Sequence, residues 1–165
     1  MGADIYLNSR YEANQAKWQP AFDAAVAVRN AKYPQGVQMP DDCPEQRAVS
    51  EAFQNMYSVG YFRDSYNATR LFGVLDLSWW DNDFIRKDGK MGARGMKKLR
   101  AKLDAFGEIT EAKLGPWAKA QEHVNFKAEG NALSDWATMF ERKRTNLIAL
   151  IDEALALGEP LDCSV

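Results

Sequence analysis

The segment LSDWATMFERKRTNLIALIDEALALGEP, residues 133–160, carries the strongest structural signal in this 165-residue chain. Its apolar residues recur every three or four positions over about six turns, which predicts a helix with one buried side. Gly158 and Pro160 follow the last of them and predict where the helix ends. The apolar side consists of Leu133, Trp136, Ala137, Phe140, Leu147, Ile148, Ile151 and Leu155.

Five further helices are predicted before this segment. Ser9 and Glu12 form a capping box at the start of the first helix, and Pro20 inside it predicts either a kink or two abutting helices. The other four are predicted to begin near Pro44, Asn67, Ala93 and Pro116. The apolar stripes of the first two helices are Tyr11, Trp18, Phe22, Val26 and Tyr33, and Val49, Ala52, Phe53, Met56 and Tyr57.

Helices of this length bury their apolar sides only against one another. The sequence therefore predicts an all-α fold, a single-domain bundle of about six helices that spans residues 1–165. Two short segments, ADIYLN at residues 3–8 and GVLDLSWW at residues 73–80, are also compatible with strands. The alternative is a mostly helical fold with a short N-terminal strand or hairpin.

The composition favours a folded, soluble protein. Hydrophobic residues make up 46% of the chain and aromatic residues 12%, which is above the range of disordered proteins. There is no apolar run of about 18 residues and no signal-peptide pattern, so we expect a cytoplasmic location. Cys43 and Cys163 lack metal-site spacing and are expected to be reduced thiols. With His123 as the single histidine, neither a metal nor a cofactor is predicted.

Positive charge is concentrated between Arg86 and Lys102, a segment with eight basic residues and one acid and a local charge of +7. Because the whole chain has a charge of −2, the remainder sums to −9. Such a segment suits phosphate, nucleic acid or an acidic protein surface, and Gly89, Gly92 and Gly95 would let the backbone approach a phosphate. The alternative is a solvated helix face that pairs with the acidic remainder. The candidate binding residues here are Lys90, Arg94, Lys97, Lys98 and Lys102.

A second cluster lies in YFRDSYN, residues 61–67, and in SWWDND, residues 78–83. It combines aromatic rings with hydrogen-bonding side chains, the composition that binding hot spots favour. The alternative is structural, with Asp64 or Asn67 capping a helix, Arg63 in an ion pair and Trp79 or Trp80 in the core. The candidate binding residues of this cluster are Tyr61, Arg63, Asp64, Tyr66, Asn67 and Trp80.

Three segments, MGADIYL, YFRDSYN and LSWWDND, are similar to segments of uncharacterised bacterial and phage-encoded proteins of about this length. The similarity covers the first half of the chain. It implies that residues 61–67 and 79–81 belong to a shared framework, and it implies no activity, cofactor or partner.

The leading functional hypothesis is a small helical binding protein that recognises a macromolecular partner, with a protein as the favoured partner. It would be a regulator or inhibitor of host machinery encoded by a phage or another mobile element. One alternative is the binding or turnover of a small phosphorylated ligand such as a nucleotide. Another is a virion or scaffold component, which predicts a stable oligomer and an exposed apolar patch. No catalytic residue is assigned, because no nucleophile motif accompanies the single histidine.

Overall fold

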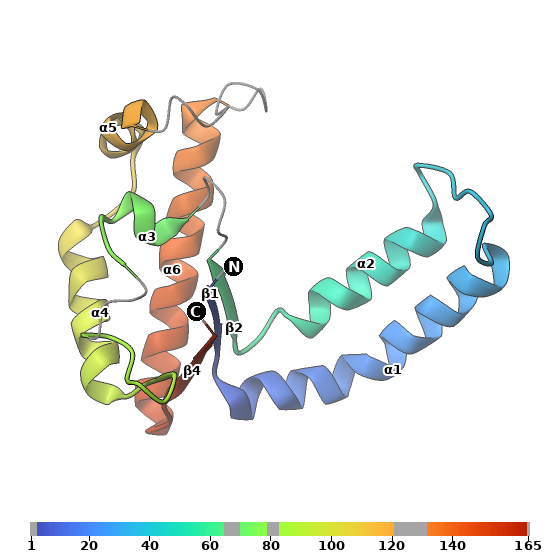
Figure 1. Ribbon diagram of the computed structural model, residues 1–165, viewed down its shortest axis with the longest axis horizontal. Coiled ribbons are helices and arrows are strands. Elements are labelled where there is room, and N and C mark those ends of the chain that lie inside the picture. Colours follow the sequence, from blue (N-terminus) through green and yellow to red (C-terminus); the bar gives the residue numbers. More distant parts are fainter. Residues whose placement is uncertain (1–2, 65–69, 79–82, 121–131, 165) are drawn as a thin grey trace. The chain divides into compact units, whose positions relative to one another are not determined.

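The computed structural model describes residues 3–64, 70–78, 83–120 and 132–164 (Figure 1). These residues divide into two compact units. The first consists of the chain up to Leu7 and from Phe62 onward, and the second of Asn8–Tyr61. The elements in chain order are β1 (Ala3–Tyr6), α1 (Asn8–Lys32), α2 (Pro44–Met56), β2 (Tyr61–Asp64), α3 (Leu71–Val74), β3 (Lys90–Met91), α4 (Ala93–Phe106), α5 (Glu111–Ala120), α6 (Leu133–Leu157) and β4 (Leu161–Ser164).

The fold is mostly helical, as predicted, but it also contains a four-stranded sheet with the order β2-β1-β4-β3. β4 pairs antiparallel with β1, where Ile5 lies opposite Cys163, and with β3, where Met91 lies opposite Leu161. The predicted strand at ADIYLN is therefore confirmed, and the all-α description is too narrow. Each strand has only two to four residues, too few to show the alternating pattern that identifies a strand in a sequence.

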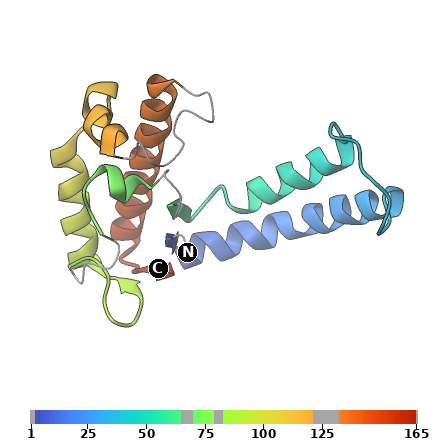
Figure 2. The ribbon, with the colours of Figure 1, turned by 45° about the horizontal axis from the view of Figure 1, so that its top comes forward.

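In the first unit, α6 packs against α4 and α5 (Figures 1 and 2). The predicted apolar side of α6 is confirmed, since five of its eight residues are buried and the other three are half-buried. Apolar residues of the sheet complete this core. The largest side chains that are fully buried in this unit are Phe72, Phe140, Ile5, Leu7, Leu71, Met91, Met96, Leu99, Leu103, Leu114, Leu147 and Ile151.

The helix boundaries agree with the prediction for α4 and α6 and differ from it for α5. α4 and α6 begin at the predicted residues, and α6 is followed by Gly158 in the left-handed conformation, with φ of 70°. α5 begins at Glu111, so the prediction that Pro116 starts this helix was wrong and Pro116 lies within it. Although α1 and α6 each have 25 residues, no helix within the described ranges is both long and apolar enough to cross a membrane.

The second unit is a helical hairpin, a name used here for Asn8–Tyr61, in which α1 and α2 run side by side in opposite directions (Figures 1 and 2). α1 begins one residue before Ser9 and continues through Pro20 as a single helix. Gly60 closes the hairpin with φ of 67°, and its α-carbon lies so close to α1 that an added Cβ would be 2.5 Å from the backbone nitrogen of Tyr11. A glycine is therefore required at this position.

Candidate functional site

Half of the basic segment is paired with acids inside the first unit. Arg86 is 2.8 Å from Asp88, Lys90 is 3.3 Å from Asp162, Lys98 is 2.8 Å from Asp83, and Arg100 is 2.9 Å from Asp152. Each distance joins a side-chain nitrogen of the basic residue to a carboxylate oxygen of the acidic residue. The pairs lower the net charge that the segment offers to a partner, which supports the alternative of a solvated, internally compensated surface.

The remaining cations of α4 are Arg94, Lys97 and Lys102, and all three are exposed. None of them forms an ion pair with a residue in the described part of the chain. Lys98 hydrogen-bonds the Asp83 carboxylate and lowers its pKa, and the nearby charges of Arg94 and Lys102 lower that pKa further. We call Arg94, Lys97, Lys98 and Lys102 the basic face. A shallow depression on α4 is lined by the first three of these residues together with Ala93 and Ala101.

Two glycines of this segment have structural roles, Gly95 in packing and Gly89 in a turn. An added Cβ at Gly95 would lie 2.1 Å from the carbonyl oxygen of Phe84, so Gly95 lets α4 approach the preceding segment. Gly89 has φ of 76° in the turn before β3, where its backbone nitrogen donates to the carbonyl of Arg86 at 3.0 Å. Both positions therefore have a structural reason that requires no phosphate.

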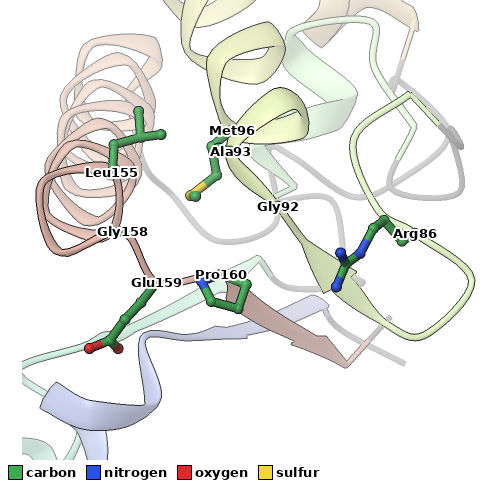
Figure 3. A pocket seen from close by; sticks show the side chains of 8 residues that line it. All are labelled: Arg86, Gly92, Ala93, Met96, Leu155, Gly158, Glu159 and Pro160. Atoms are coloured by element: carbon green, nitrogen blue, oxygen red, sulfur yellow. The ribbon is translucent and has the colours of Figure 1, made fainter.

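A pocket of about 220 Å³ lies between the start of α4 and the end of α6. Figure 3 shows the Arg86 guanidinium and the Glu159 carboxylate at opposite ends of its lining. The hypothesis of a small phosphorylated ligand uses the glycine segment and Arg63 to hold phosphate, with Asp64, Asp81 or Glu111 as acid, base or magnesium ligand. Gly92 of the glycine segment lines the pocket, Arg63, Asp64 and Glu111 do not, and Asp81 lies outside the described residues. The lining residues of the pocket are Arg86, Gly92, Ala93, Met96, Leu155, Gly158, Glu159 and Pro160. Across the described ranges, no three His, Cys, Asp or Glu side chains gather as a metal site would require.

Arg63 and Asp64 lie next to each other on β2 in different environments. Arg63 is exposed, with its Nε 3.7 Å from the Asp4 carboxylate. Asp64 is fully buried and accepts hydrogen bonds from the backbone nitrogens of Leu71 at 2.7 Å and Phe72 at 3.1 Å, in the first turn of α3. The N-cap residue of α3 is Arg70, so Asp64 is not the N-cap that the structural alternative proposed, but from seven residues before the helix its carboxylate accepts from the first two backbone amides of α3. Tyr66, Asn67 and Trp80 lie outside the described residues.

The hairpin contains a cluster of aromatic rings that the sequence did not single out as a site. The Phe22 and Phe53 ring centroids are 6.1 Å apart, and those of Phe53 and Tyr57 are 4.7 Å apart. Tyr57 is 5.0 Å from Tyr61, and Tyr11 is 5.9 Å from Tyr57 and 6.0 Å from Tyr61. Of the predicted binding residues, Tyr61 belongs to this cluster.

Exposed apolar side chains are concentrated in the hairpin. Among the described residues, six large apolar side chains are exposed, and five of them lie between Asn8 and Tyr61. Phe53 is 49% exposed although the sequence predicted it to be buried with Met56, which is 6% exposed. The five are Val28, Val37, Met39, Phe53 and Val59. Single exposed apolar side chains are ordinary on protein surfaces, so of these five the one that belongs to an aromatic cluster, Phe53, is the candidate for a contact.

One side of the hairpin carries aromatic, amide and hydroxyl side chains, and the guanidinium of Arg29 lies beside them and donates to Gln46 Oε1 at 3.1 Å. On α1 this side comprises Gln15, Phe22 and Val26, and on α2 it comprises Gln46, Ser50, Phe53 and Tyr57; we call these seven residues the hairpin face. Their spacing places each set on one side of its helix, and the Phe22–Phe53 ring contact shows that the two sets meet. Interface centres are depleted of charge and enriched in aromatic residues, so this composition fits a protein contact.

Comparisons of the chain with protein-family models, with curated proteins and with solved structures find no match. The functional argument therefore rests on the residues of the chain itself.

Proposed function

We propose that this chain is a binding protein that recognises another protein and makes the contact through the hairpin face. The observation that carries the proposal is that Phe53 is 49% exposed although its ring belongs to an aromatic cluster. The other four exposed apolar side chains of the hairpin lie outside the hairpin face. Covering the exposed half of a phenylalanine removes on the order of 100 Å² from water, which is worth about 2 to 3 kcal/mol. One such residue can therefore decide whether a partner stays bound.

The chemistry of the face favours a protein over a polyanion. Nucleic acids are bound mainly through Lys and Arg contacts to phosphates, and none of the seven residues of the hairpin face is basic. The face combines aromatic rings, which make apolar contacts, with amide and hydroxyl groups, which form hydrogen bonds around them. Protein–protein interfaces have the same combination.

Site-specific photo-crosslinking tests this proposal. A photo-reactive benzoylphenylalanine replaces Phe53 in the full chain, which is irradiated in the cells that produce it. The matched control carries the same group at Ala149, an exposed position on α6. We expect one discrete adduct from position 53 and none from position 149, with the partner identified by mass spectrometry and then purified.

The purified partner should bind the unmodified chain at least tenfold more tightly than Phe53→Glu. Gln54→Glu, which adds the same charge at an exposed neighbouring position outside the face, should bind like the unmodified chain. Equal labelling from positions 53 and 149, or equal binding by Phe53→Glu, would count against the proposal.

A second candidate function is the binding of an anionic macromolecule through the basic face. The observation that favours it is that Arg94, Lys97 and Lys102 remain exposed after the internal pairs have formed. Titration of fluorescent DNA and RNA oligonucleotides and of polyglutamate, at low and moderate salt, tests it directly. Binding to either class that weakens with salt and is lost on reversing the charge of Arg94, Lys98 and Lys102 would support it.

A further inference from the structure

We propose that the pocket between the start of α4 and the end of α6 binds a small zwitterion, a molecule with a carboxylate and an ammonium group at opposite ends of an apolar chain. ω-Amino acids and apolar dipeptides belong to this class. The binding goes beyond the proposed function, because all residues that line the pocket belong to the first unit and none belongs to the hairpin.

The volume and the walls of the pocket fit a ligand of this size. Pockets for drug-sized molecules have about 300 to 1,000 Å³, so a smaller ligand suits this one. A water molecule takes up about 30 Å³ in the liquid, so 220 Å³ is room for about seven waters. The side chains of Ala93, Met96, Leu155 and Pro160 give the pocket apolar walls, and Figure 3 shows Pro160 between the two charged side chains.

Arg86 supplies the positive end of the pocket. Its Nε and Nη2 atoms donate to the Asp88 carboxylate at 3.2 Å and 2.8 Å, which fixes the plane of the guanidinium. Its Nη1 atom lies on the side of Gly92, where an added Cβ would be 3.8 Å from it. Nη1 donates to no residue in the described part of the chain, so it is available to a carboxylate in the pocket.

Glu159 supplies the negative end of the pocket. The turn that ends α6 holds it there, because the backbone nitrogen of Gly158 donates to the Leu155 carbonyl at 3.3 Å and that of Glu159 to the Ala154 carbonyl at 3.0 Å. The side chain is half-buried, and among the described residues no cation pairs with its carboxylate. A partly desolvated carboxylate of this kind suits an ammonium group.

The ends of the two helices add to the polarity that these two side chains define. α4 begins beside Arg86, with Gly92 as an N-cap that has no side chain to satisfy the first amides, and α6 ends beside Glu159. A helix start has a partial positive charge and a helix end a partial negative charge. The field along the pocket therefore favours one orientation of a dipolar ligand, with its carboxylate at Arg86.

The same charges favour a zwitterion over a phosphorylated ligand. A phosphate group has close to two negative charges at neutral pH. Asp88 already occupies one edge of the Arg86 guanidinium, and the Glu159 carboxylate would repel a second anionic group. A ligand with one charge of each sign meets an opposite charge at both ends.

Titration of the full chain with 6-aminohexanoate, followed by the backbone amide signals in two-dimensional NMR spectra, tests the inference. The signals of Gly92 and Gly158 should shift and saturate with a dissociation constant on the order of 1 mM, as expected for a ligand of about ten heavy atoms. The signal of Gly36, in the hairpin, should not move. Hexanoate and hexylamine each lack one of the charged groups and should bind at least tenfold more weakly. Shorter and longer ω-amino acids and the dipeptide alanyl-leucine show which members of the class fit.

Charge-neutral variants assign the two ends. Arg86→Gln and Glu159→Gln should each weaken the binding of 6-aminohexanoate at least tenfold. Lys87→Gln changes an exposed neighbour that does not line the pocket and should bind like the unmodified chain. If the spectrum of Arg86→Gln shows that the turn at Asp88 is disturbed, Glu159→Gln decides alone. The inference is overturned if Gly92 and Gly158 show no saturable shift with any ω-amino acid or with the dipeptide, if hexanoate binds as tightly as 6-aminohexanoate, or if Glu159→Gln binds normally.

Discussion

The side-chain amide of Asn14 joins α1 to the end of α2. Its Nδ2 atom is 2.7 Å from the carbonyl oxygen of Asn55 and 2.9 Å from that of Met56. Carbonyls in the last turn of a helix have no partner within the helix. Asn14 donates to two of them, and the Asn55 carbonyl also accepts from the Ser58 hydroxyl at 2.7 Å. The hairpin is thus closed by a polar contact at its base in addition to its few buried apolar side chains.

Replacing Asn14 with leucine should destabilise the protein even though the new side chain is apolar and of similar size. The buried contact with the Met56 carbonyl would be lost, at a cost of about 1 to 3 kcal/mol in the free energy of unfolding, whereas the Asn55 carbonyl would keep its hydrogen bond from Ser58. Urea denaturation followed by far-ultraviolet circular dichroism measures the change. The control is Asn30→Leu on the exposed side of the same helix; equal midpoints for the two variants would show that the Asn14 contact adds nothing.

Gly60→Ala should lower the melting temperature more than Gly36→Ala. Both glycines have positive φ, 67° and 91°, so both variants carry the cost of a left-handed alanine, about 1 to 2 kcal/mol. The two positions differ in the room that is available for an added Cβ atom. A Cβ at Gly60 would be 2.5 Å from the backbone nitrogen of Tyr11 and 2.8 Å from the Cβ of Arg10, whereas a Cβ at Gly36 has no atom within 4 Å.

Calorimetry of these two variants measures the clash alone, because the conformational cost is shared. Closely similar melting temperatures would mean that the backbone at Gly60 can move away from α1 without loss of stability. That result would contradict the close contact between Gly60 and Tyr11.

Asp64 and Arg63 should respond very differently to replacement by alanine. Asp64 is fully buried, accepts two backbone hydrogen bonds and lies 3.3 Å from Lys143 Nζ, so Asp64→Ala should cost about 3 kcal/mol or more. Arg63 is exposed and its ion pair with Asp4 is long, so Arg63→Ala should change stability by less than about 1 kcal/mol. Denaturant midpoints give both values, and a large effect of Arg63→Ala would indicate a structural role for its side chain.

The ionisation of Glu45 should depend on Lys32. The Lys32 side chain hydrogen-bonds the Glu45 carboxylate at 2.6 Å and, together with a backbone hydrogen bond and the Cys43 thiol, lowers the pKa of Glu45 from 4.5 to about 2. A pKa that is lower in the folded than in the unfolded state adds stability above pH 4.5, and this contribution disappears as the pH falls towards 2. Carbon-13 NMR of the side-chain carboxyl measures the pKa, and Lys32→Gln should raise it towards 4.5. An unchanged titration would show that the pair does not persist in solution.

The long helices could be predicted from the sequence because their signal is local. α4 and α6 begin at Ala93 and Leu133, where a run of regularly spaced apolar residues begins. The start of α5 could not be predicted in this way, since Pro116 suits a helix start by its geometry but is accommodated here inside the helix.

The sheet could not be predicted because its pairing is not local. The residues of β4, Leu161–Ser164, give no pattern by themselves, and they become a strand through pairing with β1 near the other end of the chain and with the two residues of β3. Single-sequence patterns contain no information about such distant partners.

The two candidate surfaces differ in how readily they can be predicted from the sequence. The basic segment stands out by composition alone, but only the coordinates show which of its cations are already paired. The hairpin face could not be predicted because Phe53 and Met56 belong to the same predicted apolar stripe of α2. Which of the two side chains is exposed depends on how much of that stripe α1 covers.

The pairing of β1 with β4 also sets the order in which the chain can assemble during its synthesis. Ile5 pairs with Cys163, about 160 positions later, so at 5 to 20 residues per second β1 waits on the order of 10 s or more for its partner to leave the ribosome. The contacts of the hairpin lie within residues 8–61 and are complete much earlier. A nascent chain therefore completes the hairpin while the sheet of the first unit still lacks β4.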